Sequence, residues 1–72
     1  MSSWAVEIAA DYPTRAVIEA VKDVWDALDA DRRIWAAIAI RSGFSETDDS
    51  EFVRAALARE DDTAVIVELR RI

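Results

Sequence analysis

Carboxylates are the main chemistry-bearing side chains of this 72-residue chain, which has 15 Asp and Glu residues but no His and no Cys. Catalysis by a nucleophile and a base usually requires His or Cys, so the common nucleophilic arrangements cannot form. The usual zinc sites are excluded for the same reason, and only Ca²⁺ or Mg²⁺ would suit the oxygen ligands that remain. We therefore predict a protein that is not an enzyme and that holds no metal and no cofactor.

The densest group of carboxylates lies in SETDDSE, residues 45–51. The segment lacks the alternating ligand spacing and the central Gly of an EF-hand loop, so calcium binding is not favoured. An anion is not favoured either, because Glu46, Asp48 and Asp49 already place negative charge there. Acidic side chains at the start of a helix interact favourably with its dipole and its free N–H groups. We therefore interpret this segment as the beginning of a helix.

The chain carries a net charge of −6 and a single Lys, Lys22. A protein that binds nucleic acid needs a clustered excess of basic residues, so direct nucleic-acid binding is not expected. A row of carboxylates can be a solvated face, or it can present negative charge to a basic protein. The predicted acidic surface consists of Glu19, Asp23, Asp26, Glu46, Asp48 and Asp49.

The elements that position these residues follow from the spacing of apolar side chains. Apolar residues alternate from Trp4 to Ala10, which predicts a strand that ends before Pro13. From Thr14 the spacing changes to three and four residues, which predicts an amphipathic helix. Its apolar positions are Val17, Val21, Val24 and Leu28.

The segment RRIWAAIAIRSG, residues 32–43, fits two structures. Its Ala content favours a helix with Gly43 as the C-terminal cap. The alternation of Ile34, Ala36, Ile38 and Ile40 favours a strand, and the other two alternating segments need a third strand to form a stable sheet. We predict a strand.

The segment AVIEAVKDVWDALDADRRIWAAIAIRSGFS, residues 16–45, resembles the helix-then-strand unit near the N-terminus of crotonase-family proteins. There a helix ends in a turn like DALDAD and leads into a strand that closes with Gly. The resemblance implies that residues 34–41 are extended. It implies no activity and no site residues, because that family uses Gly-rich loops and this chain has one Gly.

The residue pattern in the remainder of the chain predicts a second helix and a third strand. Phe52, Val53, Ala56 and Leu57 form the inner stripe of the helix, and Asp61 and Asp62 form a turn. The last ten residues, TAVIVELRRI, alternate like a strand. The expected fold is a single α/β domain over residues 1–72, with α+β as the alternative. It is a single-layer, three-stranded sheet in the order β-α-β-α-β with both helices on one face.

Two helices on one face leave the other face of such a sheet uncovered. Its surface would be flat and apolar, and apolar patches with an exposed Trp are typical of contact sites. We therefore predict that this face binds a second copy of the chain, giving a homodimer, or another protein. Its residues are Trp35, Ala37, Ala39, Ile66 and Ala5.

The predicted function is a small, acidic, non-enzymatic module for protein–protein interaction that self-associates through this sheet face. The alternative is an inhibitor of the phage or antitoxin type, whose acidic, DNA-mimicking surface blocks a basic site on a nucleic-acid enzyme. No apolar run approaches the length of about 20 residues that spans a membrane, and the N-terminus does not resemble a signal peptide. The expected location is therefore the cytoplasm.

Overall fold

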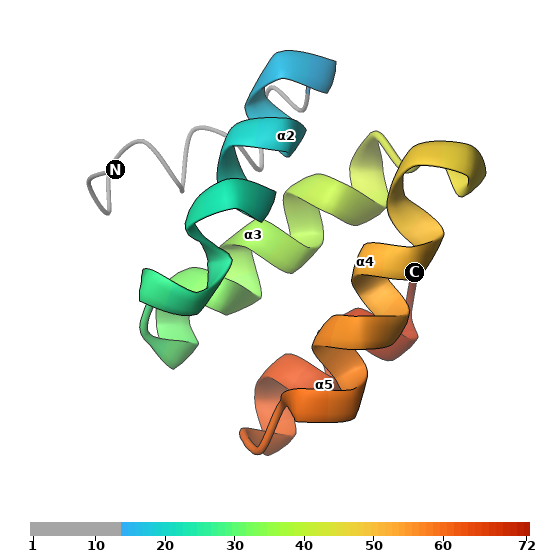
Figure 1. The fold of residues 1–72 in the computed structure, drawn as a ribbon. Helices are drawn as coiled ribbons and strands as arrows, with labels where there is room; N and C mark the ends of the chain where they lie inside the picture. The colour runs from blue at the N-terminus through green and yellow to red at the C-terminus, as the bar shows by residue number, and fades with distance from the viewer. Residues whose placement is uncertain (1–13) are drawn as a thin grey trace.

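The computed structural model describes residues 14–72, and this part of the chain contains helices and no strand (Figure 1). The α-helices are α2 (Arg15–Val24), α3 (Ala30–Ser42), α4 (Glu46–Arg59) and α5 (Thr63–Arg70), with a short 3-10 helix, η1 (Trp25–Ala27), after α2. The prediction of an α/β fold is therefore wrong. The strand predicted at residues 4–10 lies outside the described residues.

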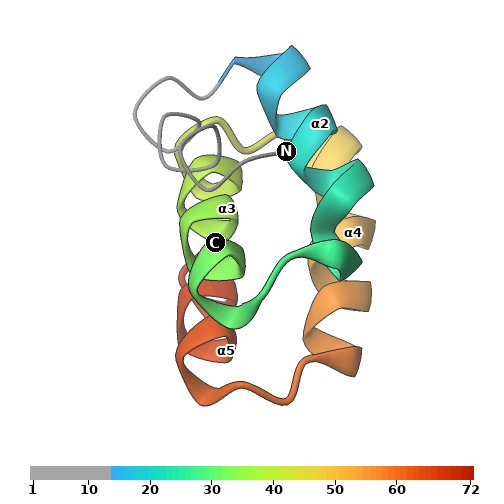
Figure 2. The same cartoon turned by 90° about the vertical axis from the view of Figure 1, so that its left-hand side faces the viewer.

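The four α-helices form two layers, seen from the side in Figure 2: α3 and α5 form one, α2 and α4 the other. The most extensive helix packing joins α3 to α5. Across the layers α2 packs on α3, and α4 packs on α5. The outer side of the α3–α5 layer is thus turned away from α2 and α4.

Each of the four α-helices begins with a side chain that accepts a hydrogen bond from a backbone N–H in its first turn. These N-cap residues are Thr14, Asp29, Ser45 and Asp62. Such a cap satisfies one of the N–H groups that an isolated helix leaves unpaired, and each contributes about 1 kcal/mol. The capping residues therefore set where the helices begin.

Apolar residues from all four of the described α-helices make the core, and most of them are small or branched. In α3 the buried residues are Ala36, Ala37, Ala39 and Ile40. The other helices and η1 contribute Ile18, Val21, Trp25, Val53, Ala56, Val65 and Leu69, and Leu28 adds to them. Because Ala has a short side chain, neighbouring helices can approach α3 closely.

The strand predicted for residues 34–41 is wrong, because the whole stretch belongs to α3. Asp29 caps its start, and the N–H of Gly43 bonds to the carbonyl of Ala39 at its end. Ala has the highest intrinsic helix propensity, and here that propensity outweighs the alternation of Ile with Ala. The extended conformation implied by the crotonase resemblance is wrong for the same residues.

The strand predicted at the C-terminus is also wrong, because residues 63–70 form α5. Val65 and Leu69 lie four residues apart and are both buried, whereas Val67 is 44% exposed. A β-branched run is common in strands, but strand preference depends strongly on context. Here the run packs as a helix against α3.

The two helices predicted around residues 14–28 and 46–59 are confirmed. The first ends as an α-helix at Val24, and η1 completes it. In α4, Val53 and Ala56 are buried, and Phe52 and Leu57 pack against the core, as the inner stripe predicts. Within residues 14–72, no helix is both long and apolar enough to cross a membrane.

Candidate functional site

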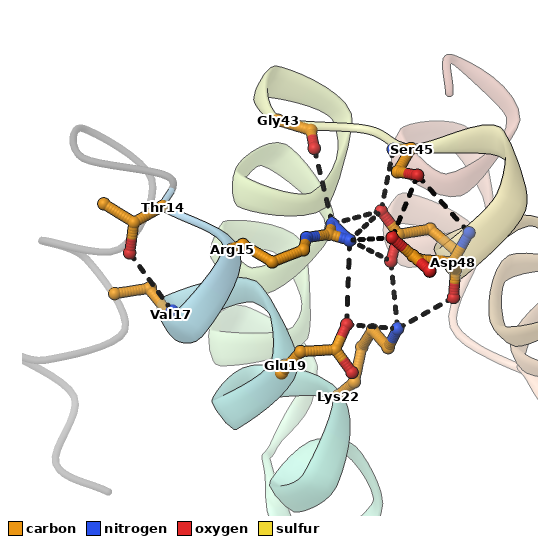
Figure 3. Close-up of polar contacts among 9 residues, drawn as sticks. Thr14, Arg15, Val17, Glu19, Lys22, Gly43, Ser45 and Asp48 are labelled. Carbon is orange, nitrogen blue, oxygen red and sulfur yellow. Dashed lines mark hydrogen bonds and ion pairs between the residues drawn. The ribbon is translucent and has the colours of Figure 1, made fainter.

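Asp49, in the first turns of α4, lies at the centre of a polar cluster that joins α4 to α2. Figure 3 shows the two cations of this cluster, Arg15 and Lys22, extending from α2 towards the start of α4. The side chain of Asp49 is fully buried. The Arg15 guanidinium donates to both carboxylate oxygens, with its shortest contact at 2.6 Å to Oδ2. Lys22 Nζ donates to Oδ1 at 2.9 Å, and the N–H of Ser45 donates to Oδ2 at 2.9 Å. A single carboxylate thus links two cations of α2 to the start of α4.

The cations extend the same cluster beyond Asp49. Lys22 Nζ also donates to the carboxylate of Glu19 at 2.8 Å and to the carbonyl of Asp48 at 3.0 Å. Arg15 donates to the carbonyl of Gly43. Three carboxylates therefore surround two cations, which balances most of the charge within the cluster.

The environment of Lys22 raises its pKa. Burial acts to lower the pKa of Lys22, but hydrogen bonds to Glu19 and Asp49, together with their negative charges, raise it above the ordinary value of 10.5. The ammonium group is therefore held in its charged form across the physiological range.

We expect this raised pKa to make stability fall at alkaline pH. Because the pKa of Lys22 is higher in the folded than in the unfolded chain, its contribution is complete below the unfolded pKa of about 10.4 and is lost as the pH rises through the folded pKa. Thermal unfolding between about pH 8 and pH 12 measures the loss. A Lys22→Arg variant keeps its charge over this range and should lose less stability. Equal losses in both proteins would contradict the assignment.

The contacts of Asp49 limit what its carboxylate can do chemically. Both of its oxygens already accept hydrogen bonds from cations, and Oδ2 accepts a backbone N–H as well. Residues 14–72 contain no group of three or more side chains that could hold a metal ion. The arrangement fits a structural clamp between α2 and α4.

A second buried carboxylate fixes the opposite end of α4. Glu60 directly follows α4, and its side chain is 3% exposed. Arg33 of α3 places NH2 3.1 Å from Oε2, and its Nε lies 3.0 Å from Oε1 without being aligned to donate a hydrogen bond. Arg33 also donates to the carbonyl of Leu28. Ionic contacts with α2 and α3 thus fix both ends of α4.

A pocket of about 170 Å³ lies beside this second ion pair. Its lining comprises Trp25, Asp26, Arg33, Arg59, Glu60 and Asp61. Arg59 bonds to Asp26 at 3.0 Å, and Arg33 bonds to Glu60, so both cations in the lining already have carboxylate partners. The pocket therefore presents no uncompensated positive charge to an anionic ligand.

An aromatic pair completes the contact between α4 and the end of α2. The Trp25 and Phe52 rings meet edge to face, with centroids 5.5 Å apart. Lys22 and Arg59 lie about 6 Å from the Phe52 centroid, within the range of a cation–π contact. The α2–α4 contact therefore combines ion pairs with one aromatic pair.

The six carboxylates of the predicted acidic surface do not share one environment in the structure. Asp49 is buried and does not belong to a surface at all. Glu19 and Asp48 lie within 4 Å of Arg15, and Asp26 pairs with Arg59. Asp23 and Glu46 are exposed and form no ion pair with a described residue. Four of the six carboxylates are thus paired with cations.

The residues predicted for the sheet face do not form one common surface. Ala37 and Ala39 are fully buried, and Ile66 is half-buried. Trp35 is 40% exposed. Ala5 lies outside the described residues. The sheet on which this face depended is absent from residues 14–72, so of this set only Trp35 presents a large exposed apolar side chain there.

Trp35 lies on the side of α3 that is turned away from the core. We name this side the outer face of α3 and define it by Asp31, Ile34, Trp35, Ile38 and Arg41, which recur at spacings of three and four residues. Of these residues, Ile34 also packs against the core. Asp31, Trp35 and Arg41 are exposed, and the two Ile residues are half-buried. The outer face therefore has an apolar centre with a charged residue of opposite sign towards each end.

Asp49 and Glu60 were not predicted to be buried residues that join helices, although the spacing of residues in α4 contained a signal for Asp49. Asp49 precedes Val53 by four residues and Phe52 by three, so it falls on the inner stripe of α4. A carboxylate on a buried stripe requires partners, and Arg15 and Lys22 supply them. For Glu60, which lies beyond the end of α4, the periodicity gives no comparable signal.

Comparisons of the chain with protein-family models, with curated proteins and with solved structures gave no match. Functional inference therefore rests on the residues themselves.

Proposed function

We propose that this protein is a small, non-enzymatic module for protein–protein interaction, which acts in the cytoplasm and binds its partner through the outer face of α3. The observation that carries the proposal is the 40% exposure of Trp35 on that face. Trp is the residue type most enriched at the energetic centres of protein interfaces. Half-buried Ile34 and Ile38 flank it and extend the apolar contact.

The two buried ionic clusters support the non-enzymatic part of the proposal, because their contacts stabilise the fold. Asp49 and Glu60 are both buried, and both bind Arg or Lys side chains from neighbouring helices. A general acid or base needs an oxygen that can reach a substrate. The carboxylate of Asp49 is enclosed by its partners, so the proposal assigns it no catalytic role.

The acidic-surface inhibitor has less support. A surface that imitates DNA needs unpaired negative charge, and most of the six predicted carboxylates are paired with cations within the protein. The two candidates respond differently to salt, because contacts between exposed charges are screened at high ionic strength. Association that weakens only slightly between about 50 and 200 mM salt favours the apolar face, whereas a steep loss would favour the inhibitor.

We expect a Trp35→Ala substitution to weaken association about 30-fold or more, which corresponds to about 2 kcal/mol for the loss of an interface Trp. Sedimentation measures self-association, and affinity purification from the native host followed by mass spectrometry measures association with other proteins. Phe44→Ala is the matched control, because Phe44 is also 40% exposed but lies in the loop after α3. The proposal fails if the two variants behave alike in both measurements.

A further inference from the structure

The outer face of α3 has the spacing of a helix that pairs with another helix. Residues 31, 34, 38 and 41 alternate at intervals of three and four, which is the spacing of the a and d positions in a coiled coil. Trp35 then occupies a flanking position beside the seam. The buried residues Ala36, Ala37, Ala39 and Ile40 lie on the other side of α3. One helix thus presents one face to its own core and a second, narrower face outward, and the partly buried Ile34 contributes to both.

This outer face is complementary to itself. If two copies of α3 run antiparallel with residue 36 of each at the centre, Ile34 of one copy lies opposite Ile38 of the other. In the same register Asp31 of one copy lies opposite Arg41 of the other. Two-fold symmetry repeats both contacts, so four Ile residues form the centre and an ion pair closes each end.

The charged residues at the two ends are available for such pairing. Asp31 is exposed and forms no ion pair with a described residue. Arg41 is exposed, and among the described residues its ion pair is a long contact of 3.7 Å with Glu68. Glu68 has a closer partner in Arg71, at 3.0 Å. Arg41 can therefore turn to a new carboxylate without leaving Glu68 unpaired.

We propose that the occupant of the outer face is a second copy of this chain, bound through an antiparallel α3–α3 contact in this register. The inference rests on the proposed function and adds the identity, direction and register of the partner. A parallel pair would place Asp31 against Asp31 and Arg41 against Arg41, and such like charges repel. Because α3 has 13 residues and is about 20 Å long, the contact is small and the dimer is weak and dependent on concentration.

The test is a charge-reversal series measured by sedimentation over a range of concentrations. Asp31→Arg alone and Arg41→Asp alone each place like charges at both ends, and each should weaken dimerisation about tenfold or more. The double variant, with both substitutions in one chain, restores opposite charges only in the antiparallel register and should dimerise within about threefold of the natural sequence. Glu51→Arg makes the same change of charge on α4 and should leave dimerisation unchanged.

Circular dichroism establishes that each variant keeps its helical content. Where a reversal reduces that content, Asp31→Asn and Arg41→Gln replace it, and each should weaken the dimer by a smaller factor. A natural chain that stays monomeric at every concentration would overturn the inference, as would a double variant no stronger than the single ones. If the chain is monomeric but Trp35→Ala still removes a co-purified protein, the proposed function stands and only the second copy is excluded.

Discussion

Replacing Asp49 by Asn is expected to destabilise the protein by about 3–5 kcal/mol, the cost of breaking a buried ion pair by removal of one partner. Asn has the same shape, but its amide group carries no negative charge and would point N–H donors at cationic donors. Arg15 and Lys22 would lose the carboxylate that holds them against α4. A domain of this length has a total stability of about 4–11 kcal/mol, so the loss is a large part of the whole.

Thermal unfolding followed by circular dichroism measures this effect, and the melting temperature should fall by about 12 °C or more. Asp48→Asn is the matched control, because it makes the same chemical change one residue away, on a side chain that is 54% exposed. Its only described ion pair is the 3.8 Å contact with Arg15, and exposed pairs of this kind contribute about 1 kcal/mol or less. Equal melting temperatures for the two variants would show that the Asp49 cluster does not hold α2 to α4.

Trp25→Ala is expected to cost about 3–5 kcal/mol, the usual range for deleting a buried aromatic side chain. Trp25 is 2% exposed and meets Phe52 edge to face. Truncation therefore removes a large part of the core and leaves the Phe52 ring without its partner. In Trp25→Phe an aromatic ring remains, so this variant should lose less stability.

Urea unfolding at low protein concentration measures the cost of Trp25→Ala without a contribution from association. Trp35→Ala is the control, because it makes the same change of side chain at a position that is 40% exposed. Under these conditions we expect Trp35→Ala to lose much less stability than Trp25→Ala. The opposite ranking would mean that Trp35, and not Trp25, belongs to the core.

Two different signals in the sequence predict α2 and α4 correctly. In α2 the apolar and charged residues fall on different sides, and the acidic first turn of α4 marks a helix start. The caps at Thr14 and Ser45 also mark the starts of these two helices. In both segments the residue pattern along the chain and the packing in the fold favour a helix.

In the two segments that were predicted wrongly, apolar and charged residues are less clearly separated than in α2. In α3 apolar residues occur nearly all round the helix, because one side faces the core and Trp35 and Ile38 lie on the other. An alternating pattern can be found in such a segment by chance. In α5 the β-branched run predicts a strand, but Val65 and Leu69 also satisfy the spacing of a buried helix face. A cap at Asp29 or Asp62 was the local signal for the helix in each case.

The residues proposed for contact differ from those predicted from the sequence, because a sheet face and a helix face select different side chains. Alternation placed Trp35, Ala37 and Ala39 together, whereas the helix turns the two Ala residues into the core. Helical spacing instead brings Ile34, Ile38 and the charged ends of α3 beside Trp35. The prediction of Trp35 as a contact residue therefore remains, with a different set of neighbours.

A dilution series followed by NMR tests most directly whether the outer face of α3 is the contact surface. The backbone amide shifts of Trp35, Ile38 and Arg41 should change with protein concentration and reach a plateau on dilution. Those of Glu51, Arg54 and Ala55, on the exposed side of α4, should stay constant. Shifts that change on α4 and not on α3, or that change nowhere at any concentration, would contradict self-association through this face.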